Sequence, residues 1–135
     1  AARALMNRAL LNTYLRNNEH RQYAFGDWDC TEFVFGHVLA QTGTDHFTAY
    51  RGRYSDYEQG VRLMKEIDRV ATVRGLVTAR LGDPVPVAFA RTGDIVSFEN
   101  IVGILYGERG IFLAEHHGYE RVSRRVLDRA WHIGI

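Results

Sequence analysis

YAFGDWDCTEFVFGHVLAQTG, residues 23–43, decides the fold and contains the chain's single cysteine, Cys30. Asp29 comes just before a run of apolar residues at helical spacing, and Glu32 follows three positions later, as in an aspartate version of the capping box. These residues predict a helix over residues 30–42, closed by a glycine. Cys30 is therefore expected in the first turn of a capped helix.

Helices are also expected on both sides of this segment. Apolar side chains at helical spacing predict a first helix over residues 2–17, which two asparagines end. A third helix is expected near residues 56–67, with Ser55 as its N-cap. A fourth is expected over residues 68–81, although Gly75 weakens it.

From residue 85 onward the pattern changes to short β-like runs between turns. The expected strands are VPVAFA (85–90), DIVSFE (94–99), IVGILYG (101–107), GIFLAEH (110–116), GYERVS (118–123) and WHIGI (131–135), with a helical turn at 124–129. Helices followed by strands, with no repeat or linker, predict one α+β domain over residues 1–135. Its helical part, about 1–82, should pack on a small antiparallel sheet or barrel at about 85–135.

Composition argues against several classes of protein. The net charge is +1 and no stretch is dense in lysine and arginine, so a nucleic-acid partner is not expected. A single cysteine without a Cys/His cluster predicts neither a disulfide nor a zinc site, and no glycine-rich phosphate loop is present, so no cofactor or metal is expected. No apolar run approaches the roughly 18 residues of a membrane span, and the first residues lack a signal-peptide pattern.

Two roles are open for Cys30 from the residues alone. A helix N-terminus favours the thiolate that nucleophilic catalysis needs. Asp29 beside it opposes that ionisation, and free cysteines are among the most frequently buried residues. For an isolated cysteine, a packed core thiol is the commoner role.

FGDWDCTEFV resembles the nucleophile segment of the NlpC-type cysteine peptidases, in which an aromatic and glycine loop leads into Asp-Cys at a helix start. TGDIVSF followed by IVGILYG resembles the second block of that family, where a Gly-Asp turn leads into a strand of the form His-Val-Gly-Ile. The chain is also similar to short phage-tail relatives of these peptidases, which share the WDC segment, a YRGRY-like loop and an ending like AWHI.

The resemblance implies a papain-like fold in which a cysteine attacks an amide carbonyl and a histidine transfers the proton. Cys30 matches the nucleophile, but Ile101 stands at the position of the histidine. His116 and His117, at the end of the next predicted strand, are the candidates to replace it as base. His37 lies on the helix of Cys30 but about 10 Å away, which is too far for a direct base.

The resemblance implies one of two functions. The first is a phage tail-tip (baseplate or hub) assembly protein with an incomplete catalytic triad, made in the host cytoplasm and located in the virion tail. Its partners would be other tail-tip proteins, and the aromatic and arginine-rich loop with Tyr50, Arg51, Arg53 and Tyr54 is the candidate interface. The alternative is an active cysteine peptidoglycan hydrolase that aids cell-wall penetration during DNA entry.

Overall fold

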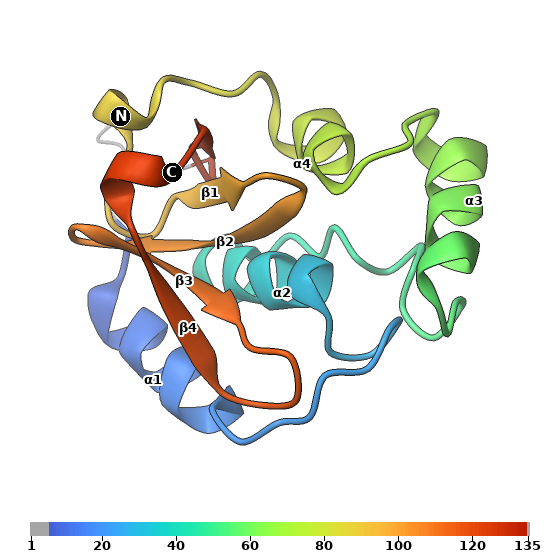
Figure 1. Cartoon of the computed structure of the whole chain (residues 1–135), viewed down its shortest axis with the longest axis horizontal. Coiled ribbons are helices and arrows are strands. Elements are labelled where there is room, and N and C mark those ends of the chain that lie inside the picture. The colour runs from blue at the N-terminus through green and yellow to red at the C-terminus, as the bar shows by residue number, and fades with distance from the viewer. Residues whose placement is uncertain (1–5, 135) are drawn as a thin grey trace.

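A computed structural model describes residues 6–134 of the chain. Four α-helices precede a five-stranded antiparallel sheet, so the predicted α+β class is confirmed (Figure 1). The helices are α1 (Arg8–Asn18), α2 (Cys30–Thr42), α3 (Tyr57–Asp68) and α4 (Val73–Leu81). The strands are β1 (Ile95–Phe98), β2 (Ile101–Tyr106), β3 (Arg109–Leu113), β4 (Tyr119–Ser123) and β5 (Arg129–Trp131).

Helix α2 begins and ends where the sequence predicts. The Asp29 carboxylate accepts the Glu32 amide at 3.0 Å, and Gly43 ends the helix in the left-handed conformation. A capping box would also have the Glu32 side chain accept a hydrogen bond from the Asp29 backbone amide, and this part of the prediction is wrong. The Glu32 side chain pairs with Arg51 at 2.9 Å instead, because burial of its carboxylate requires a charged partner.

Helix α1 begins later than predicted. Asn7 accepts the Leu10 amide at 3.1 Å and caps the helix at Arg8, so residues 6 and 7 are not helical. A side-chain cap of this kind satisfies amides that have no partner within the helix. Residues 2–5 of the predicted helix lie outside the described residues.

The predicted helices at 56–67 and 68–81 are each shifted by their caps. Asp56, not Ser55, caps α3 by accepting the Gln59 amide at 2.8 Å. Arg69 ends α3 with a φ of 60°, and Thr72 then caps α4, so residues 69–72 separate the two helices. The periodicity of the sequence runs across this break and does not reveal it.

The strands lie in the order β4-β3-β2-β1-β5, and every neighbouring pair is antiparallel. Four of the six predicted strands are present, and the one predicted at 131–135 is wrong in position: β5 spans Arg129–Trp131, and residues 132–134 are not in a strand. The strand predicted at 85–90 is wrong: Val85 forms a single bridge to Ala130, and a 3-10 turn follows at Val87–Phe89. Pro86 explains this, since proline has no amide hydrogen for a ladder.

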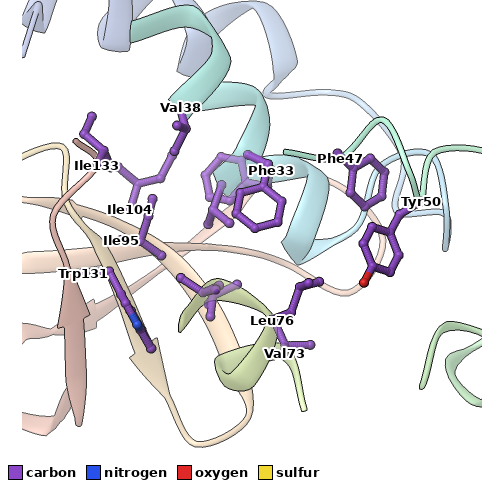
Figure 2. Packing of buried hydrophobic residues seen from close by; sticks show 14 of the residues in the cluster. Phe33, Val38, Phe47, Tyr50, Val73, Leu76, Ile95, Ile104, Trp131 and Ile133 are labelled. Atoms are coloured by element: carbon purple, nitrogen blue, oxygen red, sulfur yellow. The ribbon is translucent and has the colours of Figure 1, made fainter. Parts of the chain in front are cut away.

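The main hydrophobic core lies between one face of the sheet and helices α2 and α4 (Figure 2). Phe33 and Val38 from α2 meet Ile95, Ile104 and Trp131 from the sheet (Figure 2). Val96, Leu105, Phe112 and Ala130 point to the opposite face of the sheet, where they form a smaller cluster with Ala90 and Leu127. None of the helices within residues 6–134 has the length and apolar character to cross a membrane.

Candidate functional site

A mainly apolar pocket of about 220 Å³ opens at the N-terminus of α2. We call it the cysteine pocket. Its walls come from the loop before α2, the loop before α3, helices α3 and α4, and the turn between β1 and β2. It is lined by Tyr23, Phe25, Asp29, Cys30, Thr31, Tyr50, Tyr54, Tyr57, Gly60, Val61, Met64, Val73, Leu76, Asn100 and Ile101.

Cys30 is half-buried as a residue and lines this pocket, where its thiol is poorly solvated. Burial, followed by the charge of Asp29, raises the pKa of the thiol to about 11. A backbone contact with Val102 and a contact with Thr31 favour the thiolate, but they do not offset the burial. The helix N-terminus therefore does not produce a reactive thiolate at neutral pH.

Tyr23 lies beside the thiol, a neighbour that sequence reasoning missed. Burial, and then the proximity of Cys30 and Asp29, raise the pKa of the Tyr23 phenol. Tyr23 is seven residues before Cys30 in a loop, so no periodic pattern marks the pair as neighbours. The backbone turn between Ala24 and Trp28 brings them together.

Asp29 connects the two loops that frame the pocket. One of its carboxylate oxygens caps α2, and the other accepts the Gly26 amide at 3.0 Å and the Tyr54 hydroxyl. Gly26 has a φ of 81°, and a Cβ there would lie 2.1 Å from the Tyr54 carbonyl oxygen. The sequence predicted the cap but not this second role of the buried carboxylate.

His116 and His117 do not line the cysteine pocket, and both are exposed. The His116 carbonyl accepts the Tyr23 amide at 2.8 Å, so their turn rests against the segment that leads to Cys30. This contact comes from the backbone and brings no imidazole into the pocket lining. The structure therefore does not place either residue as the base suggested for Cys30.

His37 is fully buried elsewhere on α2 and does not line the cysteine pocket. Its Nε2 donates to the Gly93 carbonyl at 2.8 Å, and burial lowers its pKa. No group of three His, Cys, Asp or Glu residues suited to a metal ion occurs within residues 6–134. The available geometry supports binding of an apolar group better than acid-base chemistry.

Ile101 lines the pocket where the resemblance expects a histidine, and 44% of it is exposed. Phe25 and Tyr57 line the same pocket with 38% and 49% exposure. Next to Ile101, the Asn100 amide donates to the Tyr57 hydroxyl at 3.1 Å. Three exposed apolar side chains therefore gather at the pocket, a cluster that sequence reasoning did not identify.

Of the four candidate interface residues, Tyr50 is buried and Tyr54 is half-buried. Tyr50 is only 1% exposed, and its hydroxyl donates to Asp68, so it cannot contact a partner and this prediction is corrected. Tyr54 is half-buried, and its hydroxyl donates a hydrogen bond to Asp29. Their aromatic rings, which suggested an interface in the sequence, help to build the cysteine pocket.

The two arginines of this loop differ in role. Arg51 is paired with both Glu32 and Asp45 at 2.9 Å and ties the loop to α2. Arg53 is also exposed, and its guanidinium donates to the Ala49 carbonyl at 3.0 Å.

A known family matches almost the whole of this chain. Its description is a domain of unknown function, DUF6950, and the match covers residues 3–133. No match was found among curated proteins. Because the family match spans far more than half of the 135 residues, the chain belongs to the DUF6950 family.

Proposed function

We propose that this chain is a phage tail-tip assembly protein, a component of the baseplate or hub, with an NlpC-like, papain-type fold and an incomplete catalytic triad. The proposal begins from the resemblance of FGDWDCTEFV and IVGILYG to two peptidase blocks. Two further features support it: Cys30 opens a capped helix, and the strand that begins at Ile101 borders the same pocket.

The observation that carries the proposal is the composition of the cysteine pocket. Ile101 lines the pocket, and no imidazole does so among the described residues. Without a general base, amide hydrolysis loses about 10²-fold to 10⁴-fold in rate. A pocket built in this way favours a binding role for the fold over a catalytic one.

The ionisation of Cys30 supports the same conclusion. With a pKa of about 11, the thiol would be ionised in only about one molecule in 10⁴ at pH 7. Since the thiolate is the nucleophile, this fraction limits any attack on an amide.

The proposed partners are neighbouring tail-tip proteins, and the proposed contact surface is the rim of the cysteine pocket. Phe25, Tyr57 and Ile101 supply exposed apolar area there, and Arg53 is an exposed arginine of the adjacent loop. Clustered exposed apolar side chains mark interaction sites, and tyrosine and arginine are enriched in interface hot spots. The protein would be made in the host cytoplasm and located in the virion tail.

The test is a Cys30→Ser variant in the particle that is proposed to contain the protein. We expect the variant to assemble into particles that infect normally, because the proposed role needs no nucleophile. Particles that assemble but fail to penetrate the cell wall would instead favour an active cysteine peptidoglycan hydrolase, with His116 or His117 recruited as base.

A second pair of variants tests the contact surface. Tyr57→Ser at the pocket should reduce incorporation of the protein into particles, measured by quantitative mass spectrometry. Phe89→Ser is the matched control, because Phe89 is 68% exposed but does not line the pocket. Equal incorporation of both variants would contradict the assignment of this surface.

A further inference from the structure

A second pocket, of about 360 Å³, lies between α1 and the sheet, and the cysteine pocket shares none of its residues. We call it the arginine pocket. It is lined by Asn12, Leu15, Arg16, Tyr106, Arg109, Ile111 and Arg121. Figure 1 shows the surrounding elements, with α1 beside β3 and β4.

The strand register places two of the arginines on one face of the sheet. Arg121 is paired with Ile111, and Arg109 precedes Ile111 by two residues on the same strand. Because side chains alternate between faces with a period of two, Arg109, Ile111 and Arg121 share the face that α1 covers. Arg16 from α1 adds the third guanidinium.

These three cations have no ion-pair partner within residues 6–134. Arg16 makes only a 3.5 Å contact with the Thr13 hydroxyl, and no carboxylate lines the pocket. Glu19 lies nearby, since both it and Arg121 influence the Tyr119 phenol, but it is not part of the lining. All three arginines are exposed at the hollow, and like charges gathered there repel each other, which an anion would relieve.

The remaining polar groups also favour an anion. The Tyr106 hydroxyl donates to the Asn12 side-chain oxygen at 2.7 Å, which orients that amide. The Asn12 oxygen is thus occupied, and its NH₂ group remains a donor. Three guanidinium groups and an amide NH₂ make a site rich in donors, and guanidinium binds oxyanions through paired hydrogen bonds.

We propose that the arginine pocket binds a compact phosphate-bearing anion. A phosphate group can accept hydrogen bonds from several guanidinium groups at once, and multiple charges match the three cations. The site is concave and confined to one hollow, and the chain has a net charge of only +1, so an extended nucleic-acid backbone is a poorer match. This binding does not depend on the function proposed for the cysteine pocket.

The experiment is titration of the full chain with pyrophosphate at low ionic strength, followed by calorimetry and by thermal unfolding. We expect saturable one-to-one binding and a higher unfolding temperature, since a ligand of the folded state stabilises it. The Arg109→Gln/Arg121→Gln double variant should bind at least about tenfold more weakly, because two charge-assisted contacts are lost. Arg125→Gln/Arg129→Gln removes the same charge from exposed arginines outside the pocket and should bind like the original chain.

Three results would overturn the proposal. The first is no saturation below about 10 mM pyrophosphate, which is negligible affinity. The second is equal weakening in the two double variants, which would show a response to net charge alone. The third is binding of citrate or of a DNA oligonucleotide at least as tight as that of pyrophosphate, because the pocket would then not select a compact phosphate group.

Discussion

At the level of single residues, the ionisation of Cys30 depends on two opposing influences. The N-terminus of α2 favours the thiolate, whereas burial and the neighbouring Asp29 favour the thiol. The second influence prevails and moves the pKa from 9.0 to about 11. A helix N-terminus alone therefore does not make a cysteine reactive.

The first prediction concerns the pH dependence of this thiol. Alkylation of Cys30 by iodoacetamide, followed by mass spectrometry, should be slow at pH 7 and rise toward an inflection near pH 11. The raised pKa means that the protonated thiol contributes to stability below about pH 9 and that this contribution is lost as the pH rises through 11. Cys30→Ser should lack that loss between pH 9 and 11 in urea unfolding. An alkylation inflection at or below pH 8 would contradict the prediction.

The second prediction tests whether residue 101 stands in the position of a base. Ile101→His should place an imidazole in the cysteine pocket and speed alkylation of Cys30 at pH 7 by about tenfold, because a nearby imidazolium lowers the thiol pKa by a unit or more. Val126→His is the control, since Val126 is an exposed apolar residue that does not line the pocket. If the two variants reacted at the same rate, residue 101 would not occupy the catalytic position that the resemblance implies.

At the level of secondary-structure elements, the start of α2 is tied to more of the molecule than an ordinary helix start. Asp29 is 3% exposed and satisfies the Glu32 amide, the Gly26 amide and the Tyr54 hydroxyl together. Removing a shared acceptor leaves several buried donors without a partner, and each costs about 1–3 kcal/mol.

The third prediction compares two aspartate caps. Asp29→Ala should lower the free energy of unfolding by about 3 kcal/mol or more, because the cap and two buried donors are lost together. Asp56→Ala should cost about 1 kcal/mol, since Asp56 is exposed and accepts only the Gln59 amide. Urea denaturation of both variants measures the difference, and equal losses would mean that Asp29 acts only as a cap.

The fourth prediction compares two glycines with nearly equal, positive φ angles. Gly26 has a φ of 81° and Gly43 a φ of 82°, but only at Gly26 would a Cβ meet another backbone segment. Gly43→Ala should therefore lower the free energy of unfolding by about 1 kcal/mol, because alanine disfavours the left-handed conformation. Gly26→Ala should cost at least about 2 kcal/mol more, because the loop at Tyr54 must move. Thermal unfolding of the two variants measures the difference. Equal unfolding midpoints would contradict the close approach of Gly26 to the backbone of Tyr54.

Features encoded by neighbouring residues were predictable from the sequence. The cap at Asp29, the end of α2 and the hairpins from β1 to β4 follow from local chemistry. Errors arose where periodicity continued through a break, as between α3 and α4, and where Pro86 removed a ladder hydrogen bond. Alternation of apolar residues alone could not distinguish the segment at 85–90 from a strand.

At the level of the whole molecule, the cysteine pocket joins segments that are far apart in the sequence. Tyr23, Tyr54, Leu76 and Ile101 approach Cys30 only because α3, α4 and the β1–β2 turn pack around the start of α2. The sequence identified Cys30 and the position of Ile101 but not the apolar walls. Local patterns carry no information on which distant loops share a pocket.

The helices and the sheet are also joined by buried or partly buried hydrogen bonds between them. The Trp131 indole donates to the Thr78 hydroxyl at 3.1 Å, and the Tyr119 hydroxyl donates to the Leu15 carbonyl at 2.6 Å. His37 on α2 binds the turn before β1. If either part unfolded alone, these groups would lose their partners at a cost of about 1–3 kcal/mol each.

The fifth prediction follows: the chain should unfold as one cooperative unit. Its two tryptophans report on opposite parts, since Trp28 precedes α2 and Trp131 lies in β5. Trp131→Phe leaves tryptophan fluorescence only from the helical part, and Trp28→Phe leaves it only from the sheet. In each variant the fluorescence midpoint in urea should coincide with the midpoint measured by far-ultraviolet circular dichroism, because the shared core and the crossing hydrogen bonds couple the two parts. Separate midpoints within one variant would show that the helical part and the sheet unfold independently, which would contradict a single domain.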